Sequence, residues 1–399
     1  MFECMIDKLF KKVEDLDKKL PKGIGSLELY FEFIETVKRY VLYGASSGGL
    51  KTKRLIEDLG GEVVAFVDGD SKKWGTEVEK VKVYSPSNLK RLLKHEKAKL
   101  MISSSYYPEI IGFLKDVGLL PFVDWVISPV VLGIGNPKWS FKVVSVFVGF
   151  FNEDYVGRPF YERCLLNKDK IVKVMQMIED IESIESFLSV LKFRALCFVG
   201  SQPLLANYQQ YICPAFNWKE DIIVDGGAYT GDTIEFFINN ISFAKIYAFE
   251  PDEINFEVLR HKFSSNKKVV PVNCALWSNC GELDFVSLLG SGSHIEKGLP
   301  ESLGSKVKLK AVSLDSFFLN GNIDVPTFIK LDVEGAEREA LLGAEKIIKN
   351  FKPKLAVCVY HLSDDLWAIP LLVKDLNPSY KFFFGHHSSC LFESVLYAL

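Results

Sequence analysis

The sequence predicts an α/β protein with two sheets of mainly parallel strands, and three observations lead to this fold class. Apolar runs typical of buried strands alternate with segments of helical periodicity along most of the chain. Glycine-rich turns follow two of these runs, near Gly44 and near Gly227. Each turn leads from a strand into a helix and a second strand, which is the βαβ unit of parallel sheets. The length of 399 residues allows two or three domains.

The composition is that of a globular protein without a nucleic-acid partner. Lysine and arginine number 48 against 51 acidic residues, which leaves a net charge of −3 and no polybasic field. The eight cysteines include no C-x-x-C pair, so we expect reduced thiols rather than a disulfide framework.

Apolar residues are not arranged for export or for crossing a membrane. The first residues, MFECMIDKLFKK, carry charge where a signal peptide needs an apolar stretch. The longest apolar stretch, 119–135, contains Asp124 and two prolines and would make a poor membrane span. The sequence therefore predicts a cytoplasmic protein with no membrane span.

The N-terminal half divides into a helical segment and a small sheet. Residues 1–38 are charged and helical in period, with a break between Pro21 and Gly25, and predict a helical cap. Residues 39–145 predict a small Rossmann-like α/β domain. Its strands are RYVLY, EVVAFVDGD and KLMISSS, and its helices are LKTKRLIEDLG and YYPEIIGFLKDVG.

The C-terminal half contains the longer series of strands. Residues 146–215 have long helical periodicity and predict a connector, after which residues 216–399 predict the larger domain. That domain opens with the βαβ unit DIIVDGGAYTGDTIEFF and KIYAFEPD. We expect one larger sheet from the further strand candidates VVPVNCAL, GELDFVSL, VKLKAVSL, PTFIKLDV, KLAVCVY, KFFFG and SVLYAL.

Two acidic residues beside the second glycine turn indicate a small-molecule site. A strand ends at Asp225 and runs into Gly226, Gly227 and Gly231, where glycines allow a sharp turn and close approach of a ligand. Glu250 ends the next strand 25 positions after Asp225, where a carboxylate can accept bonds from both hydroxyls of a ribose. A dehydrogenase would use the same devices. Because the Asp225 carboxylate would repel a pyrophosphate, it favours a ligand with an ammonium and a sulfonium, such as S-adenosylmethionine.

Several motifs in this half resemble the FkbM family of S-adenosylmethionine-dependent O-methyltransferases over residues 219–399. They are IVDGGAYTGDT, YAFEPD, VNCAL, VSLDSF, FIKLDVEGAEREALLGA, KPKLAVCVYH and the closing strand pair. The resemblance implies the seven-stranded class I methyltransferase sheet, with KFFFG and SVLYAL as a terminal antiparallel hairpin. It also implies the cofactor S-adenosyl-L-methionine. The residues implied are Asp225, Gly227 and Gly231 for the methionine portion, Glu250 for the ribose, and Asn273, Ala275 and Leu276 for the adenine. Gly226 belongs to the same predicted cofactor site.

Candidate catalytic residues follow the later strands. In FIKLDVEGAE the polar Lys330, Asp332 and Glu334 alternate at a strand end, where open α/β sheets bind ligands. We expect Asp332 near both cofactor and acceptor, with a helix cap as the alternative. His361 ends LAVCVYH and could deprotonate a hydroxyl or only line the rim. We predict no metal site, because nothing in the spacing of Asp332, Glu334 and His361 requires one.

The first glycine turn has a similar but weaker pattern. Gly44, Ser46 and Gly49 occupy the G-x-G-x-x-G positions, and Asp68 follows Gly44 by 24 residues. Together YGASSGG, FVDGDSKKWG and VYSPSNL resemble the nucleotide-sugar-binding N-terminal domains of bacterial sugar-modifying enzymes. A scaffold without a ligand is the alternative.

The function predicted from these features is O-methylation of a hydroxyl group of a sugar, nucleotide sugar or glycan precursor. A polyketide or other small metabolite is the alternative acceptor. In a second alternative, the chain is a nucleotide-sugar or NAD-binding module with a degenerate C-terminal domain. We expect a small-molecule or glycan partner, and a homodimer is compatible with the scaffold interpretation.

Overall fold

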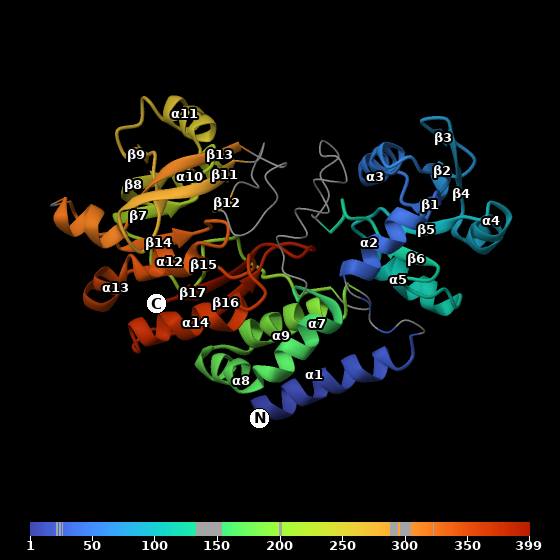
Figure 1. Ribbon diagram of the computed structural model, residues 1–399, viewed down its shortest axis with the longest axis horizontal. Helices are drawn as coiled ribbons and strands as arrows, with labels where there is room; N and C mark the ends of the chain where they lie inside the picture. The colour runs from blue at the N-terminus through green and yellow to red at the C-terminus, as the bar shows by residue number, and fades with distance from the viewer. Residues whose placement is uncertain are drawn as a thin grey trace. The chain divides into compact units, whose positions relative to one another are not determined.

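The chain folds into two compact units. The computed structural model describes residues 1–20, 23, 25, 27–132, 154–198, 202–287, 294–295, 305–321 and 323–399 (Figure 1). Unit 1 comprises Met1–Lys168, Glu185–Leu205 and Ser388–Phe392, and unit 2 comprises Asp169–Ile184, Ala206–His387 and Glu393–Leu399. The domain boundary expected between residues 145 and 146 lies outside the described residues.

Unit 1 contains a six-stranded sheet with the strand order β3-β4-β2-β1-β5-β6, in which only β3 is antiparallel to its neighbour. The predicted parallel α/β fold of this part is therefore confirmed. The strands are β1 (Arg39–Tyr43), β2 (Glu62–Val67), β3 (Glu77–Val78), β4 (Val81–Tyr84), β5 (Lys99–Ile102) and β6 (Trp125–Ile127). The connecting helices are α3 (Ser47–Asp58), α4 (Leu89–His95) and α5 (Tyr107–Asp116).

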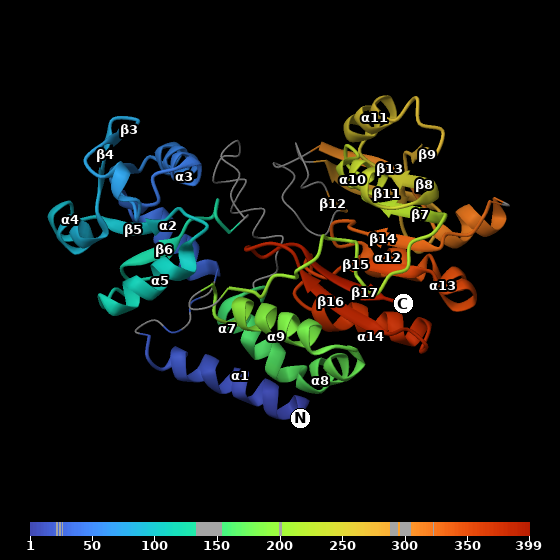
Figure 2. The ribbon, with the colours of Figure 1, turned by 180° about the vertical axis from the view of Figure 1, so that it is seen from behind.

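Helices α1 (Phe2–Asp17) and α7 (Gly157–Leu166) pack against each other through aromatic side chains, and α2 (Leu27–Thr36) precedes β1. Helix α1 lies beside α7 (Figures 1 and 2), where the Phe10 and Tyr161 rings meet edge to face at 5.4 Å. The Tyr161 hydroxyl also donates to Glu14 Oε1 at 2.9 Å.

The long helical periodicity predicted for the connector is divided into two helices, α8 (Lys168–Met177) and α9 (Ile181–Ala195). The carboxylate of Asp180 accepts bonds from the backbone N–H and the hydroxyl of Ser183, at 2.7 and 2.8 Å. A carboxylate that binds the free N–H groups of a first turn starts a new helix. The bonds between Asp180 and Ser183 therefore explain why the helical segment is interrupted between α8 and α9. The spacing of apolar residues alone does not reveal this interruption.

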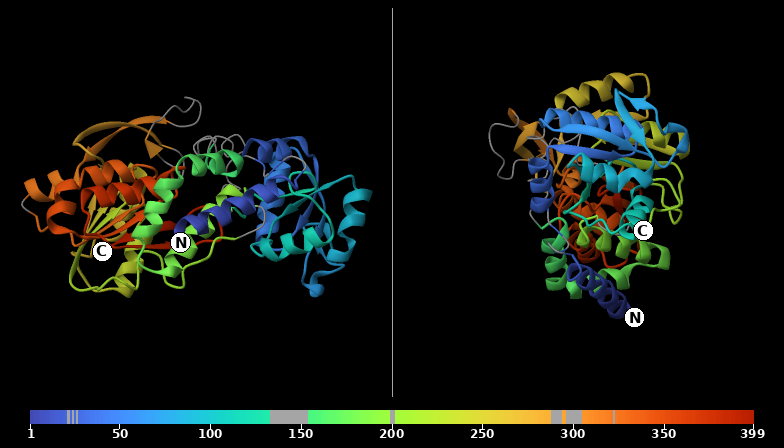
Figure 3. Two further views of the ribbon diagram at one scale, coloured as in Figure 1. Left: turned by 90° about the horizontal axis from the view of Figure 1, so that it is seen from below. Right: turned by 90° about the vertical axis from the view of Figure 1, so that its right-hand side faces the viewer.

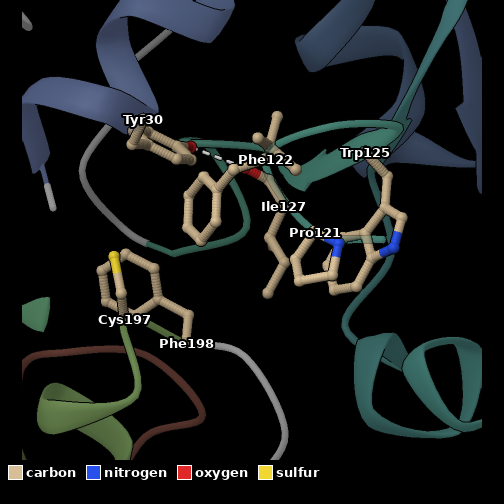
Figure 4. A pocket seen from close by; sticks show the side chains of 8 residues that line it. Tyr30, Pro121, Phe122, Trp125, Ile127, Cys197 and Phe198 are labelled. Carbon is tan, nitrogen blue, oxygen red and sulfur yellow. Dashed lines mark hydrogen bonds between the residues drawn. The ribbon is translucent and has the colours of Figure 1, made fainter. Parts of the chain in front are cut away.

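Unit 1 also has a small apolar pocket (Figure 4). Aromatic rings of Tyr30, Phe122 and Phe198 turn toward one another around it, and Cys197 lies beside Phe198. The Tyr30 hydroxyl donates to the backbone oxygen of Ile127 at 2.6 Å. The polar atom of this ring is thus already paired, and the pocket belongs to the packing of unit 1.

Unit 2 has the predicted seven-stranded sheet, in the order β16-β17-β15-β14-β7-β8-β9. Its strands are β7 (Asp221–Gly226), β8 (Phe243–Phe249), β9 (Val269–Val272), β14 (Phe328–Leu331), β15 (Lys354–Cys358), β16 (Phe382–His386) and β17 (Ser394–Ala398). Only β17 runs against its neighbours, pairing antiparallel with β15 and β16. The class I methyltransferase fold and the terminal hairpin expected from the sequence are therefore confirmed.

The helices of unit 2 connect successive parallel strands, as right-handed βαβ crossovers require. They are α10 (Asp232–Asn240), α11 (Glu253–Lys262), α12 (Glu337–Leu342), α13 (Glu345–Phe351) and α14 (Asp365–Leu376). The turns that precede α10, α11 and α12 lie at the carboxyl ends of β7, β8 and β14. Ligand-binding residues of open α/β sheets lie at this edge.

A second, smaller sheet in unit 2 corrects the prediction of one large sheet. It has the order β10-β13-β11-β12, formed by β10 (Ala275–Leu276), β11 (Gly281–Ser287), β12 (His294–Ile295) and β13 (Ser305–Val312). In the view from below, the β11–β13 hairpin stands apart from the seven-stranded sheet (Figure 3). Alternation identified these segments as strands, but pairing between strands depends on contacts distant in sequence.

Polar contacts join three strands at the amino edge of the larger sheet. Lys354 Nζ lies 2.8 Å from Asp221 Oδ2, and the Thr327 hydroxyl donates to Asp221 Oδ1 at 2.6 Å. Above them Phe328 is fully buried, with its ring 4.9 Å from that of Trp218. Packing and ion pairing therefore hold β7, β14 and β15 in register, which positions their carboxyl ends.

Two global properties complete the fold. None of the described helices is both long enough and apolar enough to cross a membrane. All eight cysteines are free thiols.

Candidate active site

The glycine turn after β7 is packed too tightly for any side chain. Gly227 has a φ of 75°, and a Cβ there would lie 1.8 Å from the backbone oxygen of Asp332. Gly231 has a φ of 87°, and a Cβ there would lie 2.3 Å from the Phe263 ring. Both positions therefore require glycine, for backbone conformation and for space. The turn and the segment after β14 are in direct contact at Gly227.

A buried ion pair lies behind this turn. Asp225 and Lys330 are opposite each other on β7 and β14, and Lys330 Nζ lies 2.9 Å from Asp225 Oδ1. The same ammonium donates to the backbone oxygens of Gly226 and Gly227, at 3.1 and 2.9 Å. Lys330, expected among the catalytic residues, is thus directed into the turn, where it positions the backbone.

The electrostatics of Asp225 differ from those of an ordinary ion pair. Burial raises the pKa of Asp225, and the attraction of Lys330 offsets only part of that effect. Its Oδ2 atom is buried and has no hydrogen-bond partner among the described residues. A buried acceptor without a partner costs free energy, so this oxygen is available to a hydrogen-bond donor of a ligand.

Glu250, directly after β8, is held against the opposite side of the turn. Its Oε2 accepts from the Tyr229 N–H and its Oε1 from the Asp252 N–H, both at 2.9 Å. Burial raises the pKa of Glu250 to about 7, although both backbone N–H groups favour the charged form. The carboxylate therefore changes its charge near neutral pH.

The residues predicted for adenine lie next to these two groups. Asn273 donates from Nδ2 to the backbone oxygen of Glu250 at 3.3 Å. Ala275 and Leu276 form β10, and a Cβ at Gly226 would lie 2.8 Å from Leu276 Cδ1. The turn, Glu250 and the Asn273–Leu276 segment thus come together at one edge of the sheet.

Asp332 lies at the carboxyl end of β14 and is held by two tyrosines. Tyr360 donates to its Oδ1 at 2.8 Å and Tyr211 to its Oδ2 at 2.9 Å. Burial alone would raise the pKa of Asp332, but Lys330, His361 and the two hydroxyls outweigh it and lower the pKa. The side chain keeps 23% of its surface exposed, so this ionised group is accessible.

The alternative role of Asp332 as a helix cap is not observed. Helix α12 begins at Glu337, and the Glu337 side chain itself accepts the N–H of Val333 at 2.8 Å. Asp332 therefore does not cap this helix.

His361 is surrounded by carboxylates. Its Nδ1 lies 2.9 Å from Glu337 Oε1, and its Nε2 lies 3.5 Å from both Asp332 Oδ1 and Glu334 Oε2. Burial alone would lower the pKa of His361, but the three carboxylates outweigh it and raise the pKa to about 10. An imidazolium cannot accept a proton, so His361 is not a base in this state.

Glu334 is the most exposed carboxylate of this group, with 39% of its side chain accessible. Its φ of 53° lies in the left-handed region, which a non-glycine residue seldom adopts. Burial, together with the charges of Asp332 and Glu337, raises the pKa of Glu334 to about 8.

Four residues of this rim were not predicted from the sequence. They are Tyr211, Glu337, Tyr360 and Glu393. Glu337 and Tyr360 stand within the quoted motifs DVEGAE and VCVYH, so their positions beside the predicted residues were a usable signal. Tyr211 and Glu393 come from loops distant in sequence, and no local pattern marks them.

The glycine turn of unit 1 has the same local bonding as the turn of unit 2. Asp68 Oδ2 accepts from the Ala45 N–H at 2.8 Å and its Oδ1 from the Asp70 N–H at 2.9 Å. Lys73 Nζ also lies 2.9 Å from Asp68 Oδ2. Burial would raise the pKa of Asp68, but the two N–H groups and Lys73 outweigh it and lower the pKa. Gly44 has a φ of 121°, and Ser46 precedes α3.

Packing also explains the third glycine of this turn. A Cβ at Gly49 would lie 2.1 Å from the backbone oxygen of Gly44, so the helix can approach the strand only through a glycine. The predicted residues Gly44, Ser46, Gly49 and Asp68 are therefore in one turn with the neighbouring strand end.

Comparison with known proteins identifies the C-terminal region. Residues 225–387 match the family described as the methyltransferase FkbM domain. The crystal structure of methyltransferase FkbM from Methylobacillus flagellatus KT has the same fold, with a TM-score of 0.64 at 20% identity over 99% of each chain.

Two further proteins are similar over shorter regions. The hexuronic acid methyltransferase AglP of Haloferax volcanii is 27% identical over 110 residues, which are 27% of this chain and 44% of AglP. The chain thus spans less than half the length of that relative. UDP-D-quinovosamine 4-dehydrogenase from Vibrio fischeri is 26% identical over 26% of this chain and 91% of its own, with a TM-score of 0.20, which is too low to support an inference.

Replacing Gly227 by alanine should destabilise unit 2. The new Cβ would collide with the Asp332 backbone oxygen, and an alanine in left-handed backbone costs about 1 to 3 kcal/mol before any shift of the loop. Urea denaturation would measure the loss in free energy of unfolding. Gly281→Ala is the matched control, because a Cβ there meets no atom within 4 Å. Equal stability of the two variants would contradict the tight contact.

Proposed function

We propose that this chain, whose residues 225–387 form a methyltransferase domain of the FkbM family, methylates a hydroxyl group of a sugar, nucleotide sugar or glycan precursor with S-adenosylmethionine as donor. The observation that carries the proposal is the pair of carboxylates, Asp225 and Glu250, at the ends of β7 and β8 on either side of a turn that only glycine can form.

The residues present fit this donor. The unpartnered Asp225 Oδ2 could accept from an ammonium group, and Glu250 has acceptor capacity left for ribose hydroxyls. Gly227 and Gly231 allow the left-handed backbone that this turn requires, which fixes the turn between the two carboxylates. When bound, S-adenosylmethionine would supply the methyl group on its sulfonium. Gly226, Gly231, Asn273, Ala275 and Leu276 complete the donor site that we propose.

Asp332 would act on the acceptor. Its two tyrosine partners fix its orientation, and its lowered pKa keeps it ionised. A carboxylate in that position could accept the proton of an acceptor hydroxyl while the hydroxyl oxygen takes the methyl group from the donor, which would leave as S-adenosylhomocysteine. Orientation of this kind supplies much of the rate in a displacement reaction. Lys330 would contribute by positioning the turn, while Glu334 and His361 border the same space.

A sugar acceptor is favoured by one relative. AglP, named as a hexuronic acid methyltransferase, is similar over 110 residues of this chain. A polyketide or other small metabolite is the alternative acceptor. A cytoplasmic location and a homodimer stay predictions.

For unit 1 we propose that the turn at Gly44, Ser46, Gly49 and Asp68 binds a nucleotide sugar. The support is the identical bonding of Asp68 and Glu250, each of which accepts an N–H from its glycine turn and an N–H two residues onward. Unlike Glu250, Asp68 is paired with Lys73, which is a cation suited to a phosphate group.

Affinity for S-adenosylhomocysteine should rise with pH because of Glu250. Its folded-state pKa of about 7 lies above the ordinary value, so the neutral carboxyl stabilises the free protein at low pH and that contribution is lost as pH rises through 7. Ribose hydroxyls bind the charged form better. Between pH 6 and 8 we expect the Kd, measured by calorimetry, to fall by up to about tenfold.

The control for this prediction is a pair of glutamine variants. Glu250→Gln should bind more weakly and lose the pH dependence that the wild type has. Glu253→Gln changes an exposed carboxylate of α11 and should retain it. A wild-type Kd independent of pH would remove Glu250 from the donor site.

Asp332→Asn should reduce kcat with little effect on donor binding. Amide nitrogen cannot accept the hydroxyl proton, and loss of such a group typically costs about 100-fold or more. Transfer of radiolabelled methyl from S-adenosylmethionine to a panel of sugars and nucleotide sugars would measure kcat, and calorimetry would measure donor affinity. If no sugar is methylated while a polyketide is, the acceptor class is wrong.

Asp68→Asn should weaken binding of a nucleotide sugar and leave donor affinity unchanged. The loss of a charged acceptor for ribose should cost about tenfold in affinity. Calorimetry of the full chain with UDP-glucose as the probe would measure it, with the exposed Asp116→Asn as control. Wild-type protein that binds no nucleotide sugar would favour the scaffold interpretation of unit 1.

A further inference from the structure

Three side chains of unit 2 bring possible metal ligands together. Asp332 follows β14, Glu337 begins α12, and His361 follows β15. One ligand atom of each lies within 4.8 Å of the others. Segments from three different elements therefore converge on one point at the carboxyl edge of the sheet.

The histidine of this cluster is buried without a proper hydrogen bond. His361 is 7% exposed, and neither ring nitrogen makes a hydrogen bond of acceptable geometry with the described residues. Nε2 lies 3.5 Å from Asp332 Oδ1 and from Glu334 Oε2, which is too long for a hydrogen bond. Two nitrogens or oxygens that share a metal ion are commonly separated by such a distance, because each bond to the ion is about 2.1 Å.

Lys330 lowers the pKa of Asp332 but offsets only part of the negative charge around His361. Three carboxylates, Asp332, Glu334 and Glu337, lie within 3.5 Å of the His361 ring nitrogens. The ammonium of Lys330 is already bound by Asp225 and two backbone oxygens. Either a proton on His361 or a divalent cation can offset these charges.

The surrounding hydrogen bonds resemble those around metal ligands. Tyr211 and Tyr360 hold both oxygens of Asp332, and the Val333 N–H holds Glu337 Oε1. Ligands of a metal ion are typically oriented by such outer contacts. A cluster that is merely charged does not require them.

We propose that Asp332, Glu337 and His361 bind a divalent transition-metal cation. One imidazole nitrogen with carboxylate oxygens suits Mn²⁺ or Zn²⁺ better than Mg²⁺, which prefers oxygen ligands alone. The three ligand atoms lie within 4.8 Å of one another, which is close to the span that bonds of about 2.1 Å to one ion allow.

The cation would also hold an acceptor hydroxyl in an open coordination position. This role rests on the proposed function, whereas the binding of the cation does not. A metal-bound hydroxyl loses its proton more readily, which would help an alcohol acceptor react. His361 would then be a ligand and not a base.

Electron paramagnetic resonance of Mn²⁺ tests the proposal on the full chain, freed of metal with a chelator. We expect one Mn²⁺ per chain, with a nitrogen coupling from histidine in pulsed spectra. Asp332→Asn and His361→Ala should each weaken binding at least tenfold, and His361→Ala should abolish the coupling. Glu345→Gln, which changes a half-exposed carboxylate of α13, should bind as the wild type does.

Two results would overturn the proposal. One is the absence of bound Mn²⁺ in the wild type at about 1 mM, which would leave the charge to a protonated His361. The other is bound Mn²⁺ without nitrogen coupling, a measurement that needs no variant to fold. The Mn²⁺ measurement contains neither methyl donor nor acceptor, so its outcome is independent of the proposed function. The protein can fail to bind Mn²⁺ and still bind S-adenosylhomocysteine, or bind Mn²⁺ and fail to bind S-adenosylhomocysteine.

Discussion

The ion pair between Asp225 and Lys330 is the contact on which the site of unit 2 depends. It joins β7 to β14 at the place where the strand order of the sheet reverses, with both side chains fully buried. Lys330 also binds the two backbone oxygens of the glycine turn, so one ammonium sets the position of three groups. A buried pair of this kind contributes little net stability but makes alternative arrangements costly. Its value here is the fixed geometry of the turn.

From that pair the site extends in two directions along the carboxyl edge. Toward β8 and β9 lie Glu250 and the Asn273–Leu276 segment, which face the donor in our proposal. Toward β15 lie Asp332 and the carboxylates around His361. The two sides share the backbone of Asp332, whose oxygen excludes any side chain at Gly227. The residues that we assign to the donor and to the acceptor are therefore joined by a direct backbone contact.

Identical local bonding has different consequences in the two units. Asp68 and Glu250 each accept two backbone N–H groups, yet the pKa of Asp68 is lowered and that of Glu250 is raised to about 7. Burial raises the pKa of both carboxylates, but at Asp68 the two N–H groups and Lys73 outweigh burial, whereas at Glu250 burial outweighs the N–H groups. Two turns with the same backbone hydrogen bonds can thus differ in charge, since Asp68 stays ionised at neutral pH while Glu250 titrates near it.

The sequence by itself determined the features that depend on residues close together along the chain. Alternation and glycine position identified the βαβ units and the strand ends at Asp225 and Glu250, because strand period and turn geometry are local properties. The terminal hairpin was expected from the resemblance to the FkbM family. The motif at Lys330, Asp332 and Glu334 was visible for the same reason.

Only the tertiary structure decided which distant residues meet. Tyr211 lies 121 positions from Asp332 and Glu337 lies 24 before His361, and no periodicity connects either pair. Assignment of β10–β13 to a separate sheet likewise required long-range pairing. The charge state of His361 depends on three carboxylates from two other elements, and the direction of Lys330 depends on its partner across the sheet. Electrostatics and strand pairing act through space, so a local pattern cannot specify them.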